Sequence, residues 1–178
     1  MSFKSTKDHY GTLAISLHWR SAVLILILIG SGFRAANSPD PSLKAAILRV
    51  HVPIAIAVLA LTLVRIAWWF GFDQRPERVG GSPAWQEHGV RAVHLLFYVV
   101  ILGMIASGIG MMVLSGAAPL IFGEAGSSLP NFSNYPPRIP HGIGAWLLVV
   151  LLMLHAGAAL YHQFVRRDGL LWRMWFSN

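Results

Sequence analysis

The sequence contains no cysteine among its 178 residues. That absence excludes disulfide bonds, iron–sulfur clusters, thiolate-bound zinc and covalently attached c-type haem. Among the remaining metal-binding side chains, histidine is the one that suits iron, zinc and copper, and the chain has eight. The chemistry of any metal centre is therefore sought first among the histidines.

Charged residues are scarce as well. They make up 12% of the chain, about half the share usual in soluble domains, while 55% of the residues are hydrophobic. A soluble protein of this size could not bury so much apolar surface, so the bilayer is the expected solvent. The net charge of +7 would suit nucleic acid. However, the basic residues lie at the ends of apolar stretches and are not interleaved with aromatic residues, so no nucleic-acid partner is predicted.

Four apolar stretches are each close to the roughly 20 residues that a membrane-spanning helix needs. Lys4 and Lys7 precede the first stretch as they would in a signal peptide, but no clean cleavage site follows it. We therefore predict one all-α integral membrane domain over residues 1–178, a four-transmembrane-helix bundle in contact with lipid. The predicted helices cover about residues 13–33, 50–70, 92–114 and 142–165.

Polar connections rich in proline and glycine separate the four stretches, at residues 37–42, 73–83 and 115–140. The third connection is long enough to fold over one face of the bundle. We predict that its prolines interrupt regular secondary structure at their positions. They are Pro119, Pro130, Pro136, Pro137 and Pro140.

The basic residues predict the orientation in the membrane. Ten lie on the side of the amino terminus and four on the other side, which predicts a multi-pass protein of the bacterial inner membrane with both termini in the cytoplasm. The ten are Lys4, Lys7, Arg20, Arg65, Arg75, Arg78, Arg91, Arg166, Arg167 and Arg173, and the four are Arg34, Lys44, Arg49 and Arg138.

Four histidines fall at only two depths in the membrane. His18, His51 and His141 open the first, second and fourth stretches, and His155 lies fourteen residues after His141, roughly 21 Å along a helix. If the helices alternate in direction, His18 and His155 approach the cytoplasmic face and His51 and His141 the periplasmic face. A single histidine at a helix end is as often a half-solvated interfacial residue. Four at matched depths mark a functional site, and two such pairs are what two b-type haems need.

The acidic residues help to choose between haem and a bare metal ion, because all seven lie outside the four stretches. A metal transporter or membrane metallohydrolase would place a carboxylate beside its histidines. Two histidines that have no other polar residue around them suit a six-coordinate haem, whose porphyrin supplies the other four nitrogens. A histidine-based metal or solute carrier is the alternative of another class. The acidic residues are Asp8, Asp40, Asp73, Glu77, Glu87, Glu124 and Asp168.

Further polar residues lie near these pairs. Arg65 is placed to meet a haem propionate at the depth of His18, or else extends its side chain to the interface. His162, Tyr161 and His94 are candidates to bind a quinone headgroup, although an interfacial belt of aromatic and histidine residues explains His94 at least as well. The four basic residues of the periplasmic side would attract an anion such as superoxide. They are Arg34, Lys44, Arg49 and Arg138.

With these residues in place, the sequence resembles the bacterial di-haem cytochrome b561 family, the small four-helix membrane cytochromes that include superoxide oxidase. The order of the matching pieces and the histidine spacing carry the resemblance, which covers nearly the whole chain. The pieces are YGTLAISLHW (10–19), RVHVPIAIAVLALTLVR (49–65), HLLFY (94–98), PHGIGAW (140–146), LHAGAALYHQF (154–164) and RRDGLLWRM (166–174).

The resemblance implies roles for particular residues. His18, His51, His141 and His155 match the family's haem ligands, Arg65 matches an arginine of the second helix, and His162 matches a histidine associated with quinone. It implies an oxidoreductase that takes electrons from superoxide at the periplasmic pair and passes them by way of the cytoplasmic pair to ubiquinone. The connection 115–140 departs from the superoxide oxidase pattern. The alternative is therefore a cytochrome b subunit that relays electrons for a separate dehydrogenase or reductase, docked as a redox partner protein.

Overall fold

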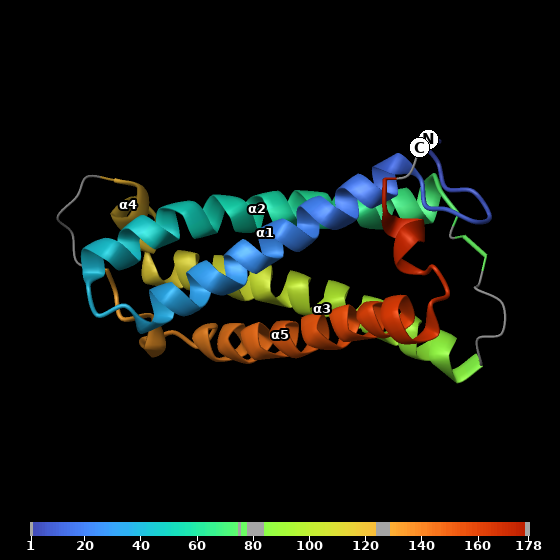
Figure 1. The fold of residues 1–178 in the computed structure, drawn as a ribbon. Helices are drawn as coiled ribbons and strands as arrows, with labels where there is room; N and C mark the ends of the chain where they lie inside the picture. Colours follow the sequence, from blue (N-terminus) through green and yellow to red (C-terminus); the bar gives the residue numbers. More distant parts are fainter. Residues whose placement is uncertain (1, 75, 78–83, 124–128, 177–178) are drawn as a thin grey trace. The chain divides into compact units, whose positions relative to one another are not determined.

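The computed structural model describes residues 2–74, 76–77, 84–123 and 129–176, and within these ranges it is helical and without strands. Each of the four long helices is long and apolar enough to cross a membrane. The prediction of an all-α chain with four membrane-spanning helices is therefore confirmed. The helices are α1 (Thr12–Asn37), α2 (Pro41–Gly71), α3 (Ala84–Ser115) and α5 (Arg138–Tyr161) (Figure 1).

The apolar side chains of these helices mostly face outward. Phe70 is 89% exposed and Val113 is 73% exposed, whereas few large apolar side chains are fully buried. A helix that is apolar on all sides belongs in lipid, where its backbone hydrogen bonds are satisfied within the helix. The exposed surface of the helices is therefore the surface that the bilayer covers.

Three helices begin several residues earlier than their hydrophobicity predicts. α2 starts at Pro41, not near residue 50, because Asp40 caps it and its carboxylate accepts the backbone N–H of Ser42 at 2.8 Å. Proline at the first helical position after such a cap is a strong start signal. α3 likewise begins at Ala84, before the predicted residue 92, and α5 begins at Arg138, before the predicted residue 142. Each of the three helices thus begins outside its apolar stretch.

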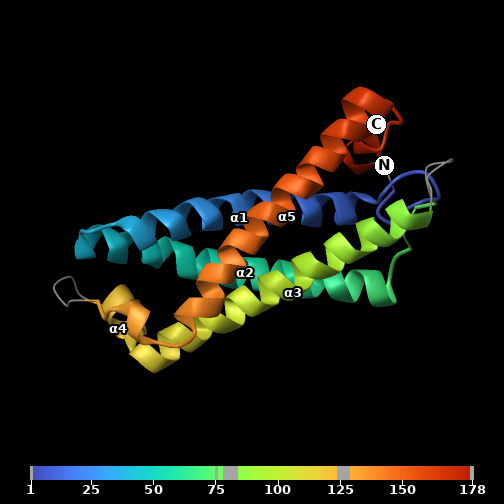
Figure 2. The same cartoon turned by 90° about the horizontal axis from the view of Figure 1, so that it is seen from below.

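A short helix, α4 (Ala117–Phe122), follows α3 directly (Figure 2). It contains Pro119, and α5 contains Pro140, so the expectation that these two prolines interrupt regular structure is wrong. Both lie in the first turn of a helix, where the backbone N–H has no partner within the helix and its loss costs nothing.

The chain divides into two compact units, and each long helix contributes one segment to each unit. The first unit comprises Met1–Ala22, Leu61–Tyr98 and Val150–Asn178. The second comprises Val23–Ala60 and Val99–Val149. His18 and His155 belong to the first unit and His51 and His141 to the second. Arg75 and Arg78, which contribute to the predicted orientation, lie outside the described residues, as does Glu124.

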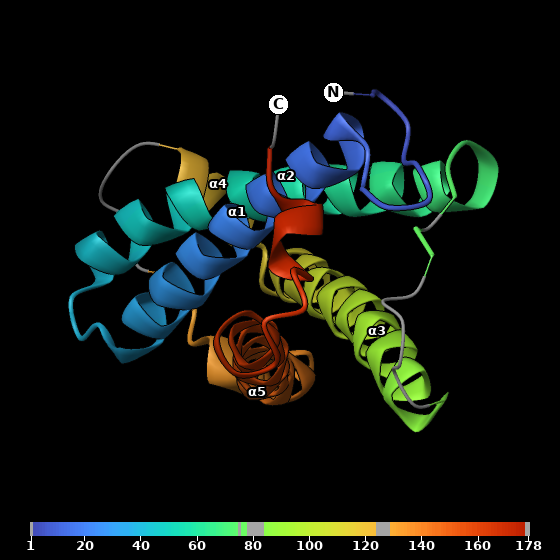
Figure 3. The same ribbon diagram turned by 45° about the vertical axis from the view of Figure 1, so that its right-hand side comes forward.

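The two ends of the chain pack together in the first unit. The backbone N–H of Tyr10 donates to the carbonyl oxygen of Arg173 at 3.2 Å, and the indole N–H of Trp19 donates to that of Met174 at 2.8 Å. Figure 3 shows the segment after α5 returning to the start of α1. The Arg173 guanidinium also donates to the carbonyl oxygen of Glu77 at 2.6 Å. Both chain ends and the residues after α2 thus form one terminal cap.

Asp73 lies at the centre of this terminal cap. Its carboxylate accepts the backbone N–H and the hydroxyl of Ser5 at 2.9 and 2.7 Å, and the indole N–H of Trp68 at 2.9 Å. Partial burial would raise the pKa of Asp73, but these hydrogen bonds and one from Gln74 outweigh it and lower the pKa below its ordinary value. The ionised carboxylate therefore joins the amino-terminal segment to the end of α2.

Replacing Asp73 with alanine is expected to lower the free energy of unfolding by about 1–3 kcal/mol, because several polar groups lose their acceptor. Unfolding of the purified protein in detergent, followed by circular dichroism, measures this. Asp8→Ala, on the same segment but exposed, should change it by no more than about 0.5 kcal/mol. Since the pKa of Asp73 is lowered in the folded state, the difference should be complete above the ordinary value of 3.8 and shrink as pH falls below it. An equal effect of the two variants would contradict this role.

Candidate functional site

In the second unit, His51 of α2 is held by a serine of α1. Its Nδ1 lies 2.9 Å from Ser31 Oγ. The Ser31 hydroxyl donates its own proton to the carbonyl oxygen of Leu28 at 3.2 Å, so its oxygen is left to accept the N–H of Nδ1. This places the ring proton on Nδ1 and leaves the lone pair of Nε2 for a metal.

The same arrangement recurs between α3 and α5. His141 Nδ1 lies 3.0 Å from Ser107 Oγ and 3.0 Å from the carbonyl oxygen of Met104. A carbonyl oxygen only accepts, so Nδ1 carries the proton here too. Ser107 donates to that same carbonyl at 2.8 Å, as Ser31 does to Leu28. The pairs α1–α2 and α3–α5 therefore present two equivalent histidines with Nε2 unprotonated.

A glycine follows each of these serines and lets the imidazole approach the helix. A Cβ atom added at Gly32 would lie 3.3 Å from His51 Cε1, and one at Gly108 would lie 3.5 Å from His141 Cε1. The first distance is tighter than an ordinary contact and the second is not. The His51 ring therefore depends more strongly on the missing side chain than the His141 ring does.

Gly32→Ala is accordingly expected to push the His51 ring away from α1 and to destabilise the haem-loaded protein by about 1–3 kcal/mol, the usual cost of an overpacked site. The matched control is Gly103→Ala on α3, where an added Cβ meets nothing within 4 Å. Thermal unfolding and haem content of both variants provide the comparison. If Gly103→Ala were as harmful as Gly32→Ala, close approach of the His51 ring would not be the cause.

Contacts of this kind are ones that metal-bound histidines make. A metal-bound histidine almost always donates its other ring N–H to an oxygen acceptor, which fixes the tautomer and the ring orientation. His51 and His141 both meet this condition, and both belong to the second unit. Each therefore has Nε2 available to bind an iron.

The pair of the first unit fits by distance. The ring centres of His18 on α1 and His155 on α5 are 6.0 Å apart. An imidazole nitrogen bound to a metal lies about 2.0–2.1 Å from it. A separation of this size would leave room for one iron held by both rings.

Two further rings lie beside His155. His94 and Phe97, both on α3, have ring centres 5.5 and 5.6 Å from that of His155, and His94 Nδ1 also lies 2.8 Å from the carbonyl oxygen of Val90. His94 therefore borders the candidate haem ligand. Within the described part of the chain, no group of three or more histidine, aspartate or glutamate side chains could hold a metal ion. Two-histidine sites suit haem better than zinc, which takes three or four protein ligands.

Arg65 of α2 also belongs to the first unit. Its Nη2 lies 3.4 Å from His18 Nδ1. A guanidinium has only donors, so it faces the lone pair of Nδ1. The arginine predicted beside the cytoplasmic pair thus contacts one of the two histidines directly.

His162 follows the last α-helical residue, Tyr161, and begins a π-helical turn over residues His162–Arg166. Its side chain is buried, with Nδ1 2.5 Å from an oxygen of Asp168 and Nε2 2.8 Å from the amide nitrogen of Gln86 on α3. Single π-helical turns are frequent at functional sites. The sequence predicted the histidine but neither of its partners.

Asp168 is ionised in this contact. Its partial burial raises the pKa of the carboxyl, but hydrogen bonds from His162 and from the backbone N–H of Leu170 outweigh that effect, and the pKa is lowered overall. The turn that brings Asp168 back to His162 passes through Arg167, which adopts a left-handed conformation with φ of 52°. A non-glycine residue in this region costs energy and persists only where its surroundings fix it.

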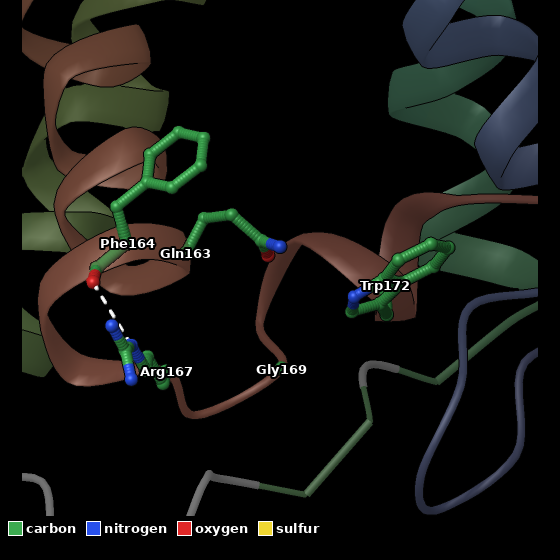
Figure 4. Close-up of a pocket in the computed structure, with 5 residues that line it drawn as sticks. All are labelled: Gln163, Phe164, Arg167, Gly169 and Trp172. Atoms are coloured by element: carbon green, nitrogen blue, oxygen red, sulfur yellow. Dashed lines mark hydrogen bonds between the residues drawn. The ribbon is translucent and has the colours of Figure 1, made fainter.

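An open pocket of about 330 Å³ lies on this turn, lined by Gln163, Phe164, Arg167, Gly169 and Trp172 (Figure 4). Its lining combines a cation with exposed aromatic rings. Tyr161 is exposed and its ring centre lies 5.9 Å from that of His162, edge to face. Of the three residues predicted to meet a quinone, Tyr161 and His162 thus lie together at the end of α5, whereas His94 lies beside His155.

The four basic residues of the predicted periplasmic side all lie in the second unit. Arg49 is engaged there, because its Nε donates to the carbonyl oxygen of Ile121 at 2.5 Å and its Nη2 to that of Gly123 at 3.3 Å. Ile121 is completely buried, so Arg49 fastens the end of α4 to α2. Arg34 is exposed, and Lys44 and Arg138 are half-buried.

Four polar residues of the site were not predicted: Ser31, Ser107, Gln86 and Asp168. The serines carry a signal in the sequence, since each is followed by glycine and precedes a histidine that opens a later apolar stretch. Gln86 and Asp168 lie outside the apolar stretches, and only the chain reversal after α5 and the early start of α3 bring them to His162.

The chain is similar to known proteins over nearly its whole length. Residues 9–177 match the family model described as prokaryotic cytochrome b561. Cytochrome b562 of Cereibacter sphaeroides is 31% identical over 172 residues, which covers 93% of this chain and 94% of the relative. Cytochrome b561 homolog 1 of Escherichia coli K12 is 27% identical over 172 residues, covering 94% and 97%. A protein of Yersinia pestis named probable superoxide oxidase CybB is 27% identical over 176 residues, covering 93% and 94%.

Proposed function

We propose that this chain, which belongs to the prokaryotic cytochrome b561 family of membrane haem proteins, holds two b-type haems and transfers electrons from superoxide to ubiquinone. The family membership and the four apolar helices establish a multi-pass electron-transfer protein of the bacterial inner membrane. One observation carries the finer proposal. The first unit brings His18 of α1 together with His155 of α5, and the second contains His51 and His141, both with Nδ1 engaged so that Nε2 is left for iron.

When bound, a haem supplies one-electron transfer, which no side chain of this sequence provides. The protein supplies ligation, orientation and a dry environment. Ser31, Ser107 and the carbonyl of Met104 orient the ligands of one haem, and the ring contacts of His94 and Phe97 border a ligand of the other. No acid–base residue is required at either histidine pair.

Arg65 is proposed to support haem binding at His18, because its guanidinium and a protonated His18 Nδ1 would both be donors and a haem propionate would give the guanidinium an acceptor. Iron bound to His18 Nε2 requires the ring proton on Nδ1, and the guanidinium at 3.4 Å faces that same nitrogen with donors only. Arg65 must then turn to another acceptor. A haem propionate is an anionic acceptor that arrives with the iron, and charge-assisted bonds between arginine and carboxylate are strong.

The quinone is proposed to bind near His162. The Asp168 carboxylate accepts the Nδ1–H of His162 at 2.5 Å, and the amide nitrogen of Gln86 donates to Nε2 at 2.8 Å. A quinone carbonyl needs a hydrogen-bond donor, which the Gln86 amide beside the ring supplies, and the reduced quinone takes its proton by way of the His162 ring. The overall reaction balances when two superoxide ions lose one electron each and leave as dioxygen. One ubiquinone takes up those two electrons and two protons and becomes ubiquinol.

Stopped-flow mixing of the oxidised, haem-loaded protein with superoxide tests the enzyme proposal. Fast reduction of the haem followed by re-oxidation on addition of a soluble ubiquinone is the expected result. If reduction by superoxide is no faster than in a denatured control, the enzyme proposal fails. The relay subunit, with its electrons supplied by a partner protein, then takes its place.

Salt and charge variants test the approach of the anion. The rate of reduction by superoxide should fall as ionic strength rises, because exposed charges are screened beyond about 8 Å at physiological salt. Arg34→Ala combined with Arg138→Ala should lower the rate further, by up to about tenfold. These two residues are chosen because Arg49 also holds α4 in place. Lys4→Ala combined with Lys7→Ala removes the same charge from the predicted cytoplasmic side, and an equal loss there would contradict local attraction.

A further inference from the structure

The two serines of the second unit occupy equivalent places but are not equally important for their histidines. Ser31 Oγ is the acceptor for His51 Nδ1, at 2.9 Å. His141 Nδ1 has Ser107 Oγ at 3.0 Å and also the carbonyl oxygen of Met104 at 3.0 Å. His51 therefore depends on a side-chain hydroxyl, whereas His141 retains a backbone acceptor that no side-chain substitution removes.

In the described part of the chain, no second acceptor is bonded to His51 Nδ1. Among the described residues, the hydrogen-bond partner of His51 Nδ1 is the hydroxyl of Ser31. The ring also lies against the backbone of α1, since a Cβ at Gly32 would be 3.3 Å from its Cε1. Both groups lie on membrane-spanning helices, where little water is available to take over the bond. Loss of the Ser31 hydroxyl would leave this N–H unpaired.

We propose that Ser31 is the positioning residue that tunes the haem held by His51 and His141, and that Ser107 contributes much less to this tuning. The inference rests on the proposed ligation of that haem. A hydrogen bond accepted from Nδ1–H makes the imidazole a more basic ligand, and a more basic ligand stabilises oxidised iron more than reduced iron. The serine on α1 thus lowers the reduction potential of this haem through His51.

Loss of such a partner weakens metal binding by about tenfold or more, and Ser31→Ala is expected to show a loss of about this size for oxidised iron relative to reduced iron. A tenfold change corresponds to an upward shift of about 59 mV for a one-electron couple. Ser107→Ala should change this ratio by less than about twofold, or about 18 mV. Ser31→Thr keeps the hydroxyl and should remain within about the same twofold of the wild type.

A spectroelectrochemical titration of the purified holoprotein provides the measurement. The haem in question is identified as the transition that is missing in His51→Ala. If Ser31→Ala loses this haem outright, the haem content of the two alanine variants gives the same comparison, with the loss confined to Ser31→Ala. The inference is overturned if both alanine variants shift or lose the haem equally, or if Ser31→Ala leaves the potential unchanged.

The failure of this inference can be told apart from failure of the proposed function. A wild-type protein with two haem transitions, one of them absent in His51→Ala, retains the proposed ligation even if the two serines prove equivalent. A wild-type protein without two transitions overturns the ligation and the role of Ser31 together.

Discussion

Replacing His51 with alanine is expected to remove one of two haems and leave the other in place. The remaining haem would be the one bound by His18 and His155, which share the first unit with ring centres 6.0 Å apart. His155→Ala should remove that haem and leave the one at His51 and His141. Pyridine haemochrome analysis of each purified variant should give about half of the wild-type haem, because a six-coordinate haem that loses one of two protein ligands is bound far more weakly.

The absorption spectra of the two variants provide the sharper comparison. His51→Ala and His155→Ala should lose different parts of the reduced-minus-oxidised spectrum of the wild type. Some loss of folded protein is expected in both, since cofactor binding and folding are linked. His9→Ala is the control, because His9 is exposed on the amino-terminal segment. Loss of the same haem in both variants would show that the pairing is wrong.

Replacing His162 with alanine should have the second large effect, on the reaction with quinone. A positioned acid accelerates proton transfer by about 10²–10⁴-fold. Re-oxidation of the reduced protein by ubiquinone should therefore slow by about 100-fold or more, while reduction by superoxide is unchanged. Asp168→Asn should slow the same step by a smaller factor, because the carboxylate at 2.5 Å acts through the imidazole.

Stopped-flow spectroscopy of the two half-reactions separates these effects from general damage. A variant that slows both half-reactions equally would indicate altered folding or haem binding. A His162→Ala protein re-oxidised by quinone as fast as the wild type would exclude His162 from the quinone site. The pocket lined by Phe164, Arg167 and Trp172 on the following turn would then be the next place to test.

Hydrophobicity alone was sufficient to predict the four long helices, since each is nearly uniformly apolar. It could not predict where they begin. The cap by Asp40 and Pro41 starts α2 within the connection that seemed to separate the helices. Likewise, a proline such as Pro119 is compatible with a helix when it falls in the first turn. Local capping, which depends on single residues, therefore decided these boundaries.

The candidate site, like the helices, could be predicted from the sequence only in part. Spacing along the sequence was enough to predict which histidines share a unit, because helices that alternate in direction bring matched depths together. The hydrogen-bond partners of those histidines required the structure. Ser31 and Ser107 look like ordinary small packing residues of membrane helices, and only the facing helix shows that each reaches an imidazole. Asp168 reaches His162 through a π-helical turn and a left-handed residue, which no periodicity indicates.

The most direct test of the central claim is the haem content of the purified wild-type chain. The protein should be prepared from haem-replete cells and analysed by the pyridine haemochrome method, with the protein concentration determined independently. Two separate histidine pairs, each completed by a porphyrin, predict close to two b-type haems per chain. One haem per chain, or a colourless protein, would contradict the account.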